Sequence, residues 1–294
     1  NTLSGFQAGD SIVDGYGNTC TGYNAGAAII ANDGNTAIGY YALRKEDDGD
    51  YNTAIGYLSM QNINYNASDG NTAIGYKSLN GGTPAAASAK NVAIGYEAMT
   101  SITGGGGNVG IGNASAYNLT TGGDNVMVGQ ASGYDVTTSS DLVLVGGDAG
   151  ANINSNDADG TVAIGYKALE DCTESQYNTA IGHYALSTIT DSGDANTVIG
   201  HHAGKLLAAA ASNTIMGAFA FDAAAGNERQ NVVIGHNAGS AMSNNDCDNN
   251  VIIGYLASFG GSAATTDCVI IGANAGEGAS AIGGADNVFI GRLA

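Results

Sequence analysis

One short motif of the type Asn-Thr-Ala-Ile-Gly returns along the whole chain, and it constrains the fold more than any other feature. Its glycine occurs seventeen times at intervals of 17 to 20 residues, so the repeats fill all 294 residues. An uninterrupted repeat of this length is typical of solenoid proteins, in which each unit stacks on the next. We therefore expect a single β-solenoid repeat domain over residues 1–294. The motif glycines are Gly5, Gly22, Gly39, Gly56, Gly75, Gly95, Gly112, Gly129, Gly146, Gly165, Gly182, Gly200, Gly217, Gly235, Gly254, Gly272 and Gly291.

The residues before each motif glycine have the pattern of a β-strand. With the glycine as position 0, position −3 is Thr or Val in all seventeen units, and position −1 is Ile, Val or Met in fifteen. These shapes favour strands, and positions two apart share a face. Position −2 is apolar as well, as at Ala37. We therefore expect both faces of the strand to be buried, with Ile38, Ile55, Ile74 and their equivalents in the core.

A strand that is apolar on both sides needs cover on both sides, whereas a lone solenoid covers only its inner face. A second copy of the chain is the simplest cover, so the sequence predicts self-association. Small side chains at position −2 should let the two copies approach closely. They are Ala37, Ala54, Ala73, Ala163 and Ala180.

The remainder of each unit predicts a corner and a loop. Position +3 is Ala or Ser in every unit, which indicates a tight internal corner. Position +4 is in most units Gly or a larger apolar residue such as Leu43. About eight variable polar residues follow and predict an exposed loop. Position −4 is Asn in fourteen units; we expect these amides to form a ladder between coils, or else to cap their own turns. The motif glycines should supply positive φ or room for a neighbouring backbone.

Charge and cysteine content exclude several classes of function. Eight basic and 27 acidic residues give a net charge of −19. Because phosphate binding relies on Lys and Arg, we expect no nucleic-acid partner, and no stretch is apolar enough for membrane insertion. The four cysteines lie at different phases of the repeat without metal-site spacing, so we expect free structural thiols. They are Cys20, Cys172, Cys247 and Cys268.

Four units share a longer pattern, in which Asn-Thr-Ala-Ile-Gly is followed by Tyr or His, a variable residue, Ala or Ser, and Leu or Met. They span residues 35–43, 52–60, 71–79 and 178–186. This pattern resembles the A-I-G-x-x-A head repeats of trimeric autotransporter adhesins and is similar to repeat tracts of virus and phage tail fibres. The resemblance implies a left-handed parallel β-roll of three chains, with the apolar strands facing the inside of the homotrimer. The adhesin unit is shorter, and the additional residues here fall in the loop.

Two groups of residues could bind metal ions. His183 and His201 follow the motif glycine in successive units, in a slot that is Tyr in seven others, so their rings should stack about 5 Å apart. No carboxylate or Cys shares their phase, and we therefore predict polar aromatic residues in a Tyr slot and no metal. Acidic loop residues could bind calcium, but they match no known calcium loop, so we expect them to be solvated. They are Asp47, Asp48, Asp50, Asp157, Asp159, Asp246 and Asp248.

No motif indicates catalysis. The chain has no G-x-S-x-G sequence and no Ser, His and Asp at matching phase, and the run Gly104–Gly107 lacks the GK[ST] that follows in a phosphate-binding loop. We expect no enzyme activity, no catalytic residue and no cofactor. Rows of Thr could bind ice, but position −3 accepts Val and shares a face with Ile that we expect to be buried.

These patterns favour a non-enzymatic structural or adhesive fibre segment, the shaft or head of a viral tail fibre or a cell-surface adhesin. We expect an extracellular location on a virion or cell, and a segment of a longer fibre protein because the last repeat is unfinished at Ala294. A host receptor or glycan would bind the loops at 44–51, 80–90 and 151–160. The alternative is a subunit of a self-assembling extracellular filament or sheath.

Overall fold

The computed structural model describes residues 1–45, 49–63, 68–81, 88–154, 158–190, 193–224, 226–240, 242, 247–258, 265–277 and 284–294. In these ranges the chain forms strands and turns and no helix, and every strand pair is parallel. The protein is therefore an all-β parallel β-solenoid, as the repeat predicts. It divides into two units, Asn1–Leu142 and Val143–Ala294. Whether one domain spans residues 1–294 stays a prediction.

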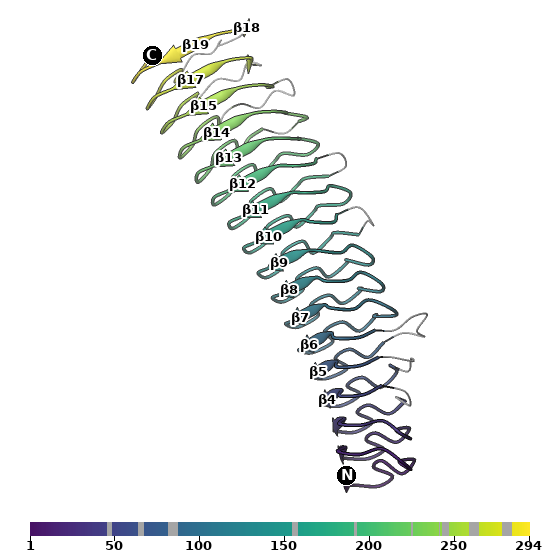
Figure 1. The fold of residues 1–294 in the computed structure, drawn as a ribbon. Coiled ribbons are helices and arrows are strands. Elements are labelled where there is room, and N and C mark those ends of the chain that lie inside the picture. The colour runs from purple at the N-terminus through teal and green to yellow at the C-terminus, as the bar shows by residue number, and fades with distance from the viewer. Residues whose placement is uncertain are drawn as a thin grey trace. The chain divides into compact units, whose positions relative to one another are not determined.

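The first unit contains one strand from each of its eight repeats. Each strand covers positions −3 to −1 and pairs with the same positions of the next repeat, as in Thr36↔Thr53 and Ile38↔Ile55. In Figure 1, β4 to β8 are successive rungs, each followed by a turn and a returning loop. The strands are β1 (Thr2–Ser4), β2 (Thr19–Thr21), β3 (Thr36–Ile38), β4 (Thr53–Ile55), β5 (Thr72–Ile74), β6 (Val92–Ile94), β7 (Val109–Ile111) and β8 (Val126–Val128).

The second unit repeats this arrangement and adds a small sheet. Nine strands pair in chain order with the same register, and β16 pairs separately with β18. The strands are β9 (Val143–Val145), β10 (Val162–Ile164), β11 (Thr179–Ile181), β12 (Thr197–Ile199), β13 (Thr214–Met216), β14 (Val232–Ile234), β15 (Val251–Ile253), β16 (Thr265–Thr266), β17 (Val269–Ile271), β18 (Gly284–Ala285) and β19 (Val288–Ile290).

Position −2 faces the interior of each coil, and this corrects the core that we expected from the sequence. Ala37 and Ala54 are fully buried within the chain. The isoleucines at position −1 lie on the opposite face, where Ile38 and Ile74 remain 38% and 37% exposed and Ile55 is half-buried. The small residues at position −2 therefore keep the coil narrow. Our expectation that they let another copy approach closely was wrong, because they face the interior of their own chain.

The motif glycines fulfil both roles that the sequence predicts. Their φ angles lie between 132° and 146°, a region that side chains with a Cβ rarely adopt. The backbones of successive coils also meet at this point: a Cβ on Gly39 would lie 2.3 Å from the carbonyl oxygen of Gly56. Any other residue at Gly39 would therefore be strained by its conformation and would also collide with the next coil.

The corner after the glycine is lined by buried side chains, as expected. Ala42 and Ser59 at position +3 are fully buried. At position +4, Leu43 and Met60 are buried too, although their φ angles of 50° and 49° are left-handed. Such a conformation costs roughly 1–2 kcal/mol for a residue with a side chain, so filling the core offsets the strain. Glycine at the same position avoids the strain and leaves a gap.

A further core column lies in the segment that we expected to be an exposed loop. The residue at position +7 is buried in eleven of the twelve units in which the structure describes it, and Ile12 in the first coil is half-buried. Its side chain fills the gap that a glycine at position +4 leaves: a Cβ on Gly26 would lie 2.9 Å from Cδ1 of Ile29. The loop therefore contributes to the core before it reaches solvent. The column comprises Ile29, Ile63, Ile102, Leu119, Val136, Ile153, Cys172, Ile189, Leu207, Ala224 and Met242.

The asparagines at position −4 form the predicted ladder between coils. The backbone N–H of Asn18 donates to Oδ1 of Asn1 at 2.8 Å, and the same bond recurs up to Leu142 in the first unit. In the second unit it runs from Asn178 to Cys268. The ladder therefore fixes the register of the strands that follow it.

Candidate functional site: an apolar strip and a histidine cluster

Each unit exposes an apolar strip along its strands. We define the outer strip as the side chains at positions −3 and −1 of β3 to β8 in the first unit, and of β9 to β15 and β17 in the second. These side chains are half-buried or exposed in every strand, and Met216 reaches 44% exposure. All of them are Thr, Val, Ile or Met. The strip is therefore continuous, uncharged and largely apolar.

A ladder of stacked aromatic rings at position +1 runs along the first unit. The rings at position +1 lie with centroids 4.9 to 5.6 Å apart and planes within 14° of parallel. Most remain exposed; Tyr57, for example, is 48% accessible. Stacking along the ladder presents ring edges more than ring faces to solvent. The ladder consists of Phe6, Tyr23, Tyr40, Tyr57, Tyr76 and Tyr96.

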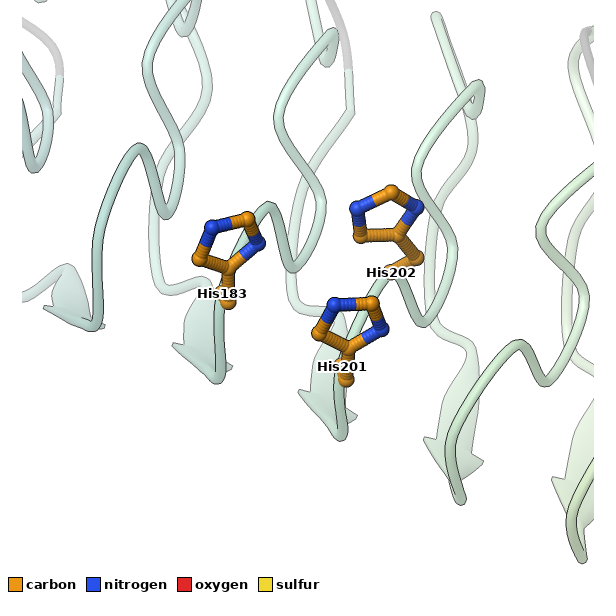
Figure 2. A group of neighbouring side chains, drawn as sticks. All are labelled: His183, His201 and His202. Carbon is orange, nitrogen blue, oxygen red and sulfur yellow. The ribbon is translucent and has the colours of Figure 1, made fainter.

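In the second unit, three histidines replace part of this ladder. His183 and His201 follow the motif glycines after β11 and β12, and His202 is the next residue on the second of these turns (Figure 2). The His183 and His201 ring centroids are 5.1 Å apart, and those of His201 and His202 are 4.2 Å apart. One potential ligand nitrogen from each ring lies within 4.8 Å of the other two.

Burial and nearby positive charge both favour an uncharged imidazole at His202. His202 is half-buried, and burial followed by the charges of His201, Lys205 and His183 lowers its pKa. Lys205 is itself placed over a neighbouring ring, with Nζ 5.1 Å from the Tyr184 centroid. A lowered pKa leaves a ring nitrogen lone pair available at neutral pH.

The acidic residues do not converge on a cation site within the described ranges. Oδ1 of Asp50 accepts the backbone N–H of Asp33 at 2.8 Å, and Oδ1 of Asp248 accepts that of Arg229 at 2.7 Å. These carboxylates occupy position −6 and bond to the preceding coil, which is a structural role that the sequence did not reveal. Asp159 is also described. Asp47, Asp48, Asp157 and Asp246 lie outside the described residues, as do parts of the loops at 44–51, 80–90 and 151–160.

The thiols are free and buried, as predicted, in Cys20, Cys172, Cys247 and Cys268. Burial raises the pKa of Cys20 and Cys172 to about 11, which disfavours the reactive thiolate. These four residues therefore belong to the packing of the coils.

The histidine cluster is the place where sequence reasoning was least complete. Alignment of the repeats on the motif glycine brings together His183 and His201, which both follow that glycine, but it does not include His202. The His-His dipeptide at 201–202 was the available signal. Among the residues that the structure describes, this cluster is the only group of three or more His, Cys, Asp or Glu side chains placed to share an ion.

Neither a protein-family model, nor a curated protein, nor a solved structure matches this chain. The described part of the chain offers no helix with the length and hydropathy of a membrane span.

Proposed function

We propose that this protein is a non-enzymatic structural or adhesive fibre segment that associates with further copies of itself through the outer strip. The observation that carries the proposal is the exposed apolar face along successive strands, with Ile38 and Ile74 each more than a third accessible. A contiguous apolar surface of this kind marks an interaction site in a soluble protein. In keeping with the adhesin-like repeats, the proposed assembly is an extracellular homotrimer on a virion or cell surface.

The distribution of charge supports this assignment. The chain carries a net charge of −19, yet no side chain at positions −3 and −1 is charged in any repeat. Charged residues are depleted at the centres of protein interfaces because their desolvation is costly. Exclusion of charge from one face of such an acidic protein indicates that this face is covered.

The spacing of the strip favours the same chain as its partner. Side chains on the strip recur once per coil, at the strand separation of about 4.8 Å. A second copy has the same period, so its ridges can fit between the rungs along the whole contact. A partner without this period would match only locally.

Light-scattering mass after size-exclusion chromatography tests the proposal. We expect three chains per particle for the wild-type protein and one chain for the double variant Ile38→Lys/Ile74→Lys, because two charges would then lie in the interface. Far-UV circular dichroism should remain unchanged, since both side chains point away from the core.

Ile30→Lys provides the matched control. Ile30 is 48% exposed but lies in the loop after the corner, away from the outer strip, so this variant should keep the wild-type mass. A wild-type monomer would contradict the proposal, as would equal loss of mass in the control. A mass that grows with concentration would favour the filament or sheath instead.

Receptor or glycan binding remains a proposal for the variable loops, because the strip and the core use the repeated positions. Binding of labelled chain to candidate host cells, with the strip variants as comparison, tests whether adhesion requires assembly.

A further inference from the structure

The three histidines of the cluster combine proximity with freedom to move. His183 and His201 are exposed, and His202 is half-buried. Their rings are nearly parallel, with interplanar angles of 13° between His183 and His201 and 5° between His201 and His202. Tyr184 and Phe219 meet the cluster edge-on. Exposed side chains can change rotamer without disturbing the coil behind them.

A shared ion requires a modest rearrangement of this stack. Two imidazole nitrogens bound to one tetrahedral zinc ion lie about 3.4 Å apart, given Zn–N distances of about 2.0–2.1 Å. The three candidate nitrogens lie within 4.8 Å of one another. Lone pairs lie in the ring planes, so the rings must rotate out of the parallel stack to converge. Rotation of the two exposed rings accomplishes this closure.

We propose that His183, His201 and His202 form a binding site for a divalent transition-metal ion of the zinc, copper and nickel class. Three imidazole ligands suit these ions, and they leave a coordination position for water or for a group from another molecule. Hard cations such as magnesium and calcium prefer oxygen ligands, which the cluster does not supply. None of the three histidines belongs to the outer strip, so this proposal does not rest on self-association.

The surrounding charge has two opposing effects on such a site. The net charge of −19 attracts cations to the protein. Lys205 acts against this attraction because it is a positive charge beside the cluster. Its Nζ lies 5.1 Å from the centroid of the Tyr184 ring, and that ring meets both His183 and His202 edge-on. The ammonium group is therefore close to the cluster, and Lys205→Gln should strengthen ion binding.

Isothermal titration of the full chain, produced without a polyhistidine tag, with ZnCl₂ at neutral pH tests the site. We expect one zinc ion per chain. His183→Gln, His201→Gln and His202→Gln should each weaken binding by more than the roughly 10- to 100-fold that loss of a supporting partner costs in metal sites. Nitrogen hyperfine structure in the electron paramagnetic resonance spectrum of the Cu²⁺ form should report imidazole coordination.

His236→Gln is the matched control, because His236 occupies the same position +1 but contacts Phe219 and Tyr255 and no other histidine. It should bind zinc like the wild type. Absence of zinc binding by the wild-type chain would overturn the proposal, and so would equal weakening in His236→Gln. Unchanged melting temperatures of the variants without metal would exclude misfolding as the cause of lost binding. A particle mass that zinc does not change, measured by light scattering, would exclude a site created by zinc-induced association of copies.

Discussion

Oδ1 of Asn35 accepts the backbone N–H of Asn52 at 2.8 Å, while Nδ2 of Asn35 donates to the carbonyl oxygen of Gly49 at 2.9 Å. One side chain thereby joins its own coil to two points of the next. Asn35 is fully buried, so water cannot replace these bonds. The recurrence of this arrangement explains why position −4 is Asn in fourteen of seventeen units.

Asn108→Ala should destabilise the protein by about 3 kcal/mol. Oδ1 of Asn108 accepts bonds from the backbone and side-chain nitrogens of Asn125, and its Nδ2 donates to Gly122 and Asn91. Truncation leaves buried donors and acceptors without partners, at roughly 1–3 kcal/mol for each such group, partly relieved by relaxation. Urea unfolding followed by circular dichroism measures the effect. Asn113→Ala, on an exposed residue of the same unit, should change stability by no more than about 0.5 kcal/mol.

Thr161→Asn should stabilise the second unit by about 1 kcal/mol, the typical net value of a hydrogen bond. Thr161 occupies position −4, and its buried hydroxyl oxygen has no hydrogen-bond partner. An Asn at 161 could accept the backbone N–H of Asn178, as Asn178 does for Asn196 at 2.9 Å. In thermal unfolding, the melting temperature should be highest for Thr161→Asn, intermediate for Thr161→Val and lowest for the wild type. Val removes the unpartnered hydroxyl but does not restore the hydrogen bond. A Thr161→Asn protein no more stable than Thr161→Val would contradict this account.

The strand, the glycine column and the asparagine ladder were predictable because each depends on one residue type at one phase. The orientation of the strand was not predictable, since positions −2 and −1 are both apolar. What decides it is the direction in which the coil closes, and this depends on left-handed residues at positions +2 and +4. Position +2 has ordinary side chains such as Tyr41, with φ of 55°, and lacks the glycine signal that usually marks such corners. Position +4 is Gly in seven units but elsewhere carries side chains such as Leu43, with φ of 50°, so its glycine signal is incomplete.

The buried column at position +7 escaped prediction for a related reason. Most of its residues are single apolar side chains among polar neighbours, as Ile102 is between Ser101 and Thr103, and others such as Ile29 and Leu207 lie in short apolar runs that do not single them out. The histidine cluster was only half predictable, because aligning repeats on position +1 reveals His183 and His201 but separates them from His202 at position +2.

Gly95→Ala should cost at least about 3 kcal/mol or prevent folding. Gly95 has φ of 143°, and a Cβ there would lie 2.2 Å from the carbonyl oxygen of Gly112. Backbone strain of this kind costs about 1–3 kcal/mol, and relief of the collision requires two coils to separate. Gly147→Ala is the control, because its Cβ would meet only the Tyr166 ring, at 3.4 Å from Cδ2 and 3.7 Å from Cε2. Soluble yield and urea midpoint are the measurements; similar values for the two variants would refute the close-approach argument.

The buried thiols should make the protein less stable as the pH rises from about 9 to about 11. Burial raises the pKa of Cys20 and Cys172 to about 11 in the folded chain, from 9.0 for an exposed thiol. Between these values the unfolded chain loses the thiol proton while the folded chain keeps it. Each pH unit in this window therefore favours unfolding by at most about 1.4 kcal/mol per thiol, and below pH 9 the contribution to stability is fully retained.

The Cys20→Ala/Cys172→Ala variant isolates this effect from the ionisation of tyrosine and lysine over the same range. Its absolute stability should be lower because two buried side chains are truncated, but its urea midpoint should fall less steeply between pH 9 and pH 11 than that of the wild type. Thiol-specific labelling of the native wild-type protein should also be slow at pH 8 and become fast in denaturant. Parallel pH slopes for the two proteins would show that the thiols ionise without unfolding, and would place Cys20 and Cys172 in contact with solvent.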